Sequence, residues 1–327
     1  MLSRAAEWCH EMEQHKQYNT MKLNKLLYHV QEKEDCIPTY FDDIDKLTGG
    51  LLVGGLTTVA GRPAMGKTPF VMSVVRNVGV MNKIPTAVLS LVDDENYVAK
   101  RLIASQLGWE AVKSIEQQQI RLTDEQKDKV AMLQRIGFES QDVGNSEFLE
   151  NVKNAPVWIE HSLDMNMKEI VSRMERLKRE NGIRLLVIDS LGWIAPESTL
   201  AASETAMQKL VHTAEKLKVA VLMTCDLSRA VEYRGGTKKP ILSDLRDNAL
   251  IEKYSSLVMF LYRPEYYCIY EDFEGSTLGV ADVIIARNRR GDIGEVRLKF
   301  VNRAGFVNRP RVSMFNPYGN GSIILSS

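Results

Sequence analysis

The sequence contains few of the features that mark secreted or membrane proteins. Its four cysteines, Cys9, Cys36, Cys225 and Cys268, lie far apart and show no C-x-x-C spacing. Such scattered cysteines predict reduced thiols and a cytoplasmic protein, and they argue against a disulfide or zinc scaffold. No stretch approaches the roughly 20 apolar residues of a membrane-spanning helix, and the first residues do not resemble a signal peptide. We therefore expect no membrane among the partners.

The sequence also lacks an excess of charge of either sign. It has 42 lysines and arginines against 42 aspartates and glutamates, which gives a formal net charge of zero at pH 7. Overall charge therefore gives no support for nucleic-acid binding, and any surface of that kind must be local. A hydrophobic fraction of 44% and a charged fraction of 26% are ordinary for a globular protein.

One segment fits G-x-x-x-x-G-K-[ST], the pattern of a phosphate-binding P-loop: Gly61, Arg62, Pro63, Ala64, Met65, Gly66, Lys67 and Thr68. The backbone N–H groups of such a loop point at a phosphate chain, and the helix that follows adds its positive end. We expect Lys67 to reach the β- and γ-phosphates and the Thr68 hydroxyl to ligate Mg²⁺. A β-rich run at 56–60 precedes the loop, and apolar residues at helical spacing follow it at 70–78, as the motif requires.

From position 38 onward, apolar runs alternate with helical patterns, which predicts an α/β fold with a mainly parallel twisted sheet flanked by helices. We expect strands at 57–60, 86–91, 157–160, 185–189, 220–224 and 257–261, and helices at 68–80, 95–107, 167–180 and 204–217. Residues 110–155 are interpreted as a helical insertion with a polar stretch around 141–147. Two further strands, 282–287 and 295–300, predict a C-terminal β-hairpin with a basic tip.

Residues 1–35 are predicted to form an N-terminal helical arm, and residues 36–327 the main domain. Within the arm, Leu23, Leu26, Leu27 and Val30 form a narrow apolar stripe at helical spacing. So short a stripe cannot support a helix alone. It packs either on its own domain or on a neighbouring subunit, and the residues leave both alternatives open.

Asp189 ends the apolar strand expected at 185–189. An aspartate at this place can hold Mg²⁺ through water beside a P-loop, or it can simply cap a following helix. With a P-loop upstream we predict that Asp189 joins Thr68 in holding the metal.

Two basic clusters admit more than one interpretation. The hairpin tip contains Arg287, Arg289 and Arg290, which form either a solvated turn or an arginine finger that reaches a neighbour's nucleotide. A second cluster surrounds Gly235-Gly236 and is either a solvated loop or a contact for a nucleic-acid backbone; it contains Arg229, Arg234, Lys238 and Lys239.

The order of these motifs resembles the ATPase domain of DnaB-type replicative helicases, a RecA-like P-loop NTPase fold. Six segments carry the resemblance: 40–51, 61–68, 89–91, 185–191, 243–246 and 283–294. The sequence Ser-Asp-Leu-Arg at 243–246 and the basic hairpin make it specific, because neither is general among P-loop proteins. The similarity extends from about 38 to 308, and residues 1–35 resemble the family's interdomain linker helix.

The resemblance implies a ring, usually of six subunits, with ATP and Mg²⁺ between subunits and single-stranded DNA in the centre. Primase or loader proteins are further candidate partners. The matching positions imply that Lys67, Thr68 and Asp189 serve the nucleotide and metal, and that Arg289 is the finger with Arg287 as its companion. The implied DNA-binding residues are Arg234, Lys238, Arg246 and Asp247.

Several positions depart from the family pattern. Val92 stands where the family has its water-activating glutamate, and Asp93 is the next residue. Asp226 replaces a glutamine that senses the γ-phosphate, and Pro69 removes a backbone N–H just after the P-loop. These departures predict an ATP-dependent helicase motor with weakened hydrolysis. The alternatives are a non-enzymatic module that holds nucleotide and assembles, and a RecA-like ATPase of another branch.

Overall fold

The computed structural model describes residues 34–117, 151–163, 165–190, 200–236, 238–301 and 305–308. The chain divides into two compact units, Met1–Asp35 and Cys36–Ser327, and the second is described here. The apolar stripe of the predicted arm and the predicted polar stretch at 141–147 lie outside the described residues. No helix within the described ranges has both the length and the apolar composition needed to cross a bilayer.

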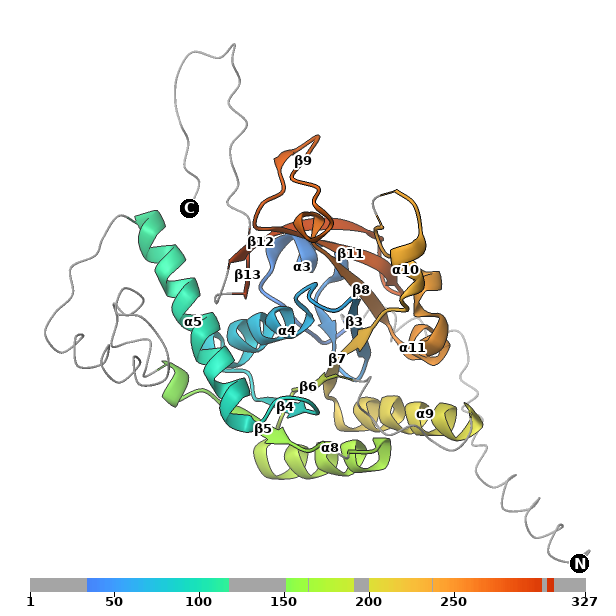
Figure 1. Cartoon of the computed structure of the whole chain (residues 1–327). Helices are drawn as coiled ribbons and strands as arrows, with labels where there is room; N and C mark the ends of the chain where they lie inside the picture. The colour runs from blue at the N-terminus through green and yellow to red at the C-terminus, as the bar shows by residue number, and fades with distance from the viewer. Residues whose placement is uncertain are drawn as a thin grey trace, which may run out of the picture. The chain divides into compact units, whose positions relative to one another are not determined.

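A nine-stranded sheet forms the centre of the domain, in the order β13-β12-β11-β8-β3-β7-β6-β4-β5 (Figure 1). Every neighbouring pair from β5 to β8 is parallel, and β11, β12 and β13 join in antiparallel fashion. The parallel strands are β3 (Leu56–Gly61), β4 (Thr86–Ser90), β5 (Val157–His161), β6 (Leu185–Asp189), β7 (Ala220–Asp226) and β8 (Leu257–Tyr262). The antiparallel strands are β11 (Val280–Asn288), β12 (Gly294–Val301) and β13 (Gly305–Val307).

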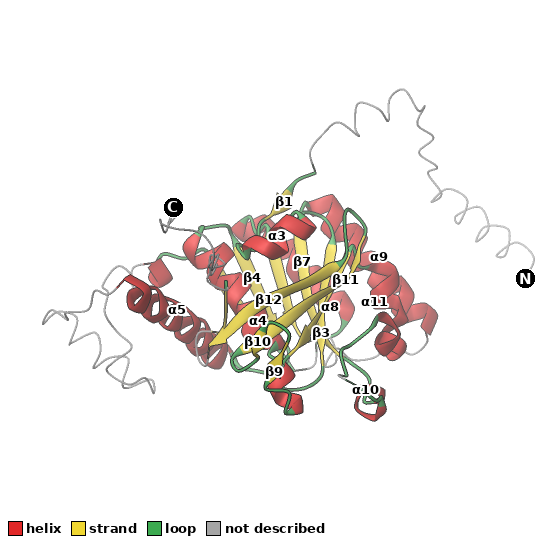
Figure 2. Cartoon of the chain, turned by 90° about the horizontal axis from the view of Figure 1, so that it is seen from above, coloured by secondary structure: helices red, strands yellow, loops and turns green. Residues whose placement is uncertain are grey.

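Helices cover both faces of this sheet (Figure 2). One face carries α3 (Asp42–Thr48), α4 (Lys67–Val75), η1 (Arg76–Met81) and α5 (Glu95–Gln117). The other face carries α8 (Met167–Asn181), α9 (Leu200–Leu217) and α11 (Ala249–Tyr254). Strand β6 shows why both faces need cover: Leu185 and Val187 pack on the first face, and Leu186 and Ile188 on the second. Near-continuous apolar strands of this kind are typical of parallel sheets buried on both sides.

Smaller elements complete the unit. The strands β1 (Cys36–Ile37) and β2 (Leu51–Leu52) pair with each other, as do β9 (Glu271–Asp272) and β10 (Gly275–Ser276). Short helical segments α10 (Ala230–Tyr233), η4 (Leu242–Asn248) and η5 (Pro264–Tyr267) lie in the connections that follow β7 and β8.

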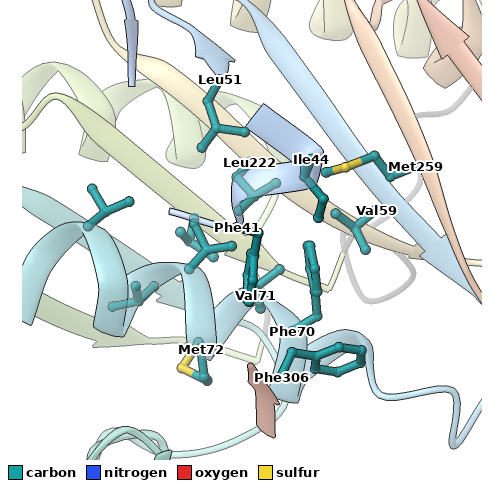
Figure 3. Packing of buried hydrophobic residues seen from close by; sticks show 14 of the residues in the cluster. Phe41, Ile44, Leu51, Val59, Phe70, Val71, Met72, Leu222, Met259 and Phe306 are labelled. Atoms are coloured by element: carbon teal, nitrogen blue, oxygen red, sulfur yellow. The ribbon is translucent and has the colours of Figure 1, made fainter. Parts of the chain in front are cut away.

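Phe70 on α4 lies at the centre of an aromatic cluster that holds the helix after the P-loop in place (Figure 3). Its ring stacks on Phe41 at a centroid distance of 5.6 Å and meets Phe306 edge-on at 5.3 Å. All three side chains are at most 1% exposed. Segments from the beginning and the end of the domain therefore fix one helix by burial of large rings.

A buried arginine reinforces the same region from behind. Arg76, only 1% exposed, donates to the backbone oxygens of Ser105 on α5 and Phe306 on β13, at 3.2 and 3.1 Å. Both acceptors are main-chain groups that would otherwise need a partner inside the core. The guanidinium thus joins η1, α5 and β13.

The predicted α/β fold, with its parallel sheet and C-terminal hairpin, is confirmed. Two predicted helix ends are wrong. The helix expected at 68–80 ends at Val75 and continues as the wider η1, where a Cβ on Gly79 would come within 2.6 Å of Val157. The helix expected to stop at 107 runs to Gln117, because the single glycine at 108 lowers helix stability by only about 1 kcal/mol.

Candidate functional site

The predicted P-loop connects β3 to α4 at the edge of the sheet where the parallel strands end. Gly66 precedes α4 with φ of 92°, and no side chain caps this helix. A Cβ at Gly66 would meet the ring of Phe306 at 3.1 Å, so glycine is required by both conformation and space. Met65 is buried and anchors the loop in the core. An uncapped helix start behind a glycine turn fits a bound phosphate chain.

Lys67 bends back over this loop. Its Nζ donates to the carbonyl oxygens of Gly61 at 3.0 Å and Arg62 at 3.3 Å, and it forms an ion pair with Asp226 Oδ1 at 2.7 Å. Asp226 is the last residue of β7 and lies opposite Gly61 in the parallel register. The carboxylate is therefore placed at the P-loop by the sheet itself.

Asp189 ends β6 and is 9% exposed. Thr224 donates to its Oδ1 at 2.5 Å, and the Thr68 hydroxyl donates to the same carboxyl group. Burial raises the pKa of Asp189; the two hydrogen bonds and the charge of Lys67 oppose that rise, and the charge of Asp93 adds to it. The structure thus brings together the two residues predicted to hold the metal.

This pair of oxygen ligands suits Mg²⁺, which usually takes one or two carboxylates and completes its shell with phosphate oxygens and water. Within the described ranges, no group of three or more acidic, histidine or cysteine side chains is placed to hold a metal. A magnesium ion at Thr68 and Asp189 would therefore need the nucleotide itself as a ligand.

The segment after β4 lies beside Asp189, because Ser90 is opposite Asp189 in the register of β4 and β6. Val92 is 44% exposed and offers no acceptor for water. The Asp93 amide donates to Ser90 Oγ at 3.1 Å, and the Asp93 carboxylate lies 3.7 Å from Arg101 Nε. Asp93 is thus the acid of this segment whose charge acts on Asp189.

The two predicted finger residues lie at the opposite edge of the sheet. Strand β8 runs parallel to β3 with Leu257 opposite Thr57, and β11 runs back along β8 until Asn288 is opposite Leu257. Arg287 and Arg289 flank Asn288, so they lie where the parallel strands begin. The six residues of β3 separate the two edges by about 20 Å. These arginines and the P-loop of the same chain therefore belong to different ends of the sheet.

The hairpin arginines differ in their contacts. Arg287 pairs with Glu252 at 3.3 Å, and Arg289 donates to the backbone oxygen of Lys253. Arg290 instead donates to the carbonyl oxygens of Thr48 and Gly50, at 2.9 and 2.8 Å. Arg290 thus fixes the turn after α3.

The predicted DNA-binding residues are placed between β7 and α11. Arg234 forms a two-pronged ion pair with Asp244, each contact 3.1 Å long, and Lys238 lies 5.7 Å above the ring of Tyr267. Arg246 and Asp247 belong to η4, and their side chains lie outside what the structure describes. DNA binding by these four residues remains a prediction.

One contact of the P-loop was not predicted from the sequence. Arg62 Nε lies 2.9 Å from Glu232 Oε1 on α10, and its Nη1 donates to the carbonyl oxygen of Leu227 at 2.9 Å. The hydroxyl of Tyr267 donates to the same Glu232 oxygen at 3.2 Å. Arg62 and Glu232 are 170 positions apart, and neither belongs to a motif that pairs them.

Comparison with known proteins places this geometry among replication proteins. The family model described as "DnaB-like helicase C terminal domain" matches residues 36–308. The replicative DNA helicase DnaB of Haemophilus influenzae is 34% identical over 270 residues, which cover 81% of this chain and 53% of that protein. The replicative DNA helicase DnaC of Bacillus subtilis is 30% identical over 284 residues, covering 84% and 57%. The chain thus spans little more than half the length of these relatives.

Two solved structures share the fold. One is an isolated ATPase domain, which superposes with a TM-score of 0.70 at 26% identity, covering 89% of this chain and 100% of that one. A DnaB-like replicative helicase, studied for its interactions with primase, superposes with a TM-score of 0.69 at 26% identity, covering 93% and 71%. Both superpositions cover most of this chain, so the likeness extends well beyond the P-loop.

Proposed function

Because this chain belongs to the family of DnaB-like helicase C-terminal domains, we propose that it binds ATP with Mg²⁺ as the motor domain of a ring-forming DNA helicase. The observation that supports the proposal most directly is the P-loop with its uncapped helix, next to the hydrogen-bonded Thr68 and Asp189. We further propose that its hydrolysis of ATP is slow.

The residues divide the work of binding. The loop amides and Lys67 hold the phosphates, while Thr68 and Asp189 hold Mg²⁺. Bound there, Mg²⁺ neutralises charge on the phosphate oxygens. Asp189 is kept in place by Thr224, so its carboxylate is already oriented toward Thr68.

Slow hydrolysis follows from two residues. Val92 carries no group that could orient the attacking water or accept its proton, a role worth about 10²–10⁴-fold in rate. Pro69, in the first turn of α4, offers no N–H to a phosphate. Binding groups are thus largely retained, while the group for proton transfer is displaced to Asp93.

The opposite positions of the P-loop and the hairpin support the proposal that sites form between subunits. An arginine about 20 Å from its own P-loop can serve a nucleotide only if that nucleotide is bound by a neighbour. We therefore propose that Arg289, with Arg287 beside it, reaches the γ-phosphate bound by the next subunit. Single-stranded DNA would pass along the loops that carry Arg234, Lys238, Arg246 and Asp247, and primase or loader proteins are further proposed partners.

We expect calorimetry to detect binding of ATP and ADP in the presence of Mg²⁺. Replacing Lys67 by alanine should weaken ATP binding about 100-fold, because charge-assisted bonds to two phosphates are lost. Lys218→Ala is a suitable control, since this lysine follows α9, outside the P-loop and its partners. Absence of binding by the wild-type chain at millimolar nucleotide would refute the proposed function.

Subunit mixing tests the finger. Chains carrying Lys67→Ala and chains carrying Arg289→Ala should each release phosphate more slowly than wild type. A mixture should be faster than the mean of the two, because some interfaces then combine an intact Lys67 with an intact Arg289. A mixture that only matches this mean would show that Arg289 does not act on a neighbour's nucleotide.

A second candidate function is a catalytically inactive module that holds nucleotide and assembles. The exposed Val92 favours it, because no acid occupies that position. Phosphate release by the wild-type chain, measured with and without single-stranded DNA, distinguishes the two: the motor turns over slowly but measurably, and the module does not.

A further inference from the structure

A carboxylate occupies the neighbourhood of the P-loop lysine. Asp226 Oδ1 lies 2.7 Å from Lys67 Nζ, with the lysine side chain 11% exposed and the aspartate side chain 49% exposed. The pair therefore lies at the rim of the site, with one partner largely enclosed and the other half open to solvent. An ion pair that is this short and only partly buried has to be exchanged whenever another anion approaches the lysine.

The backbone limits where this carboxylate can go. Asp226 lies at the end of β7, paired in register with Gly61, and the following Leu227 amide donates to the Gly61 oxygen at 3.4 Å. The other cation of the loop, Arg62, is engaged by Glu232 and by the carbonyl of Leu227. Asp226 can turn its side chain outward, but its Cα stays beside the loop.

These contacts affect diphosphates and triphosphates differently. The amides at the start of α4 can hold the phosphates nearest the nucleoside while Asp226 still faces Lys67. A terminal γ-phosphate needs the same ammonium group and adds negative charge next to the carboxylate. The triphosphate must therefore displace Asp226, whereas the diphosphate can leave part of the ion pair intact.

We propose that Asp226 determines nucleotide preference in this site by competing with the γ-phosphate for Lys67, so that the chain favours nucleoside diphosphates over triphosphates more than its P-loop alone would. The inference depends on the proposed nucleotide binding and adds to it the residue that discriminates between the two ligands. Asp226 acts here as a specificity residue.

Calorimetry on the full chain with Mg²⁺ tests this, with ADP and the slowly hydrolysed analogue β,γ-imido-ATP as probes. In Asp226→Asn, which keeps the shape and removes the charge, we expect the ratio of the triphosphate Kd to the diphosphate Kd to fall about tenfold. The control is Asp94→Asn, the same charge change on an exposed residue that accepts from the Tyr97 amide, as asparagine also can. That variant should leave the ratio within about twofold of wild type.

The outcomes separate the two proposals. If neither probe binds the wild-type chain, the proposed function fails, and this inference fails with it. If both bind and the ratio in Asp226→Asn equals that of wild type, the inference alone is overturned. A selective loss of triphosphate binding would also overturn it, because Asp226 would then be helping to hold Mg²⁺. Circular dichroism and thermal unfolding of each variant establish that it is folded.

Discussion

Replacing Val92 by glutamate should raise the rate of ATP hydrolysis about 100-fold or more. Val92 follows β4, whose end lies opposite Asp189, and its side chain is 44% exposed, so a longer acidic side chain has room there. The glutamate would accept the proton of the attacking water as the bond from the γ-phosphorus to ADP breaks. Single-turnover phosphate release, with and without single-stranded DNA, measures the change.

Two further variants give this experiment its contrast. Val92→Gln adds the same bulk without a base and should give little gain. Asp93→Asn should lower the residual rate of the wild-type chain if this neighbouring acid supplies it. Wild-type turnover of about 1–100 s⁻¹, in the ordinary range for enzymes, would contradict the weak-hydrolysis proposal. No gain in Val92→Glu would show that a missing base is not the main defect.

Replacing Phe70 by alanine should lower the free energy of unfolding by about 3–5 kcal/mol. The side chain is fully buried between Phe41 and Phe306, so its removal leaves a cavity among rings that come from distant parts of the chain (Figure 3). Urea unfolding followed by circular dichroism measures the loss. Since α4 carries Lys67 and Thr68, we also expect weaker nucleotide binding in this variant.

Phe273→Ala is the matched control. This phenylalanine is 94% exposed, so the same substitution should change the free energy of unfolding by no more than about 0.5 kcal/mol. Equal effects of the two substitutions would mean that the aromatic cluster does not stabilise the domain as described.

The sheet was predictable because its strands are short apolar runs, a pattern that a strand buried on both faces imposes on the sequence. The strand predicted at 185–189 is observed with the same ends. The P-loop was predictable for a related reason: its chemistry requires particular residues at fixed spacing. Helix ends were less predictable, since α4 gives way to η1 where Gly79 lies close to Val157, a contact between distant segments.

The pairing of site residues could not be predicted in the same way. Asp226 could be suspected from its charge, but its ion pair with Lys67 depends on the register of β3 and β7. The contact between Arg62 and Glu232 also depends on where α10 packs. Arg234 shows the converse: its sequence context predicts a DNA contact, whereas the structure pairs it with Asp244. Such partners are set by tertiary structure, which local patterns do not encode.

The separation of the P-loop from Arg287 and Arg289 has a consequence for counting. If each nucleotide needs a loop from one subunit and a finger from the next, a single subunit has no complete centre. A closed circle of such subunits has as many complete centres as members, whereas an open row always has one fewer. Closure itself would then add a unit of activity, and a gap opened to admit a DNA strand would silence one centre until the circle reseals.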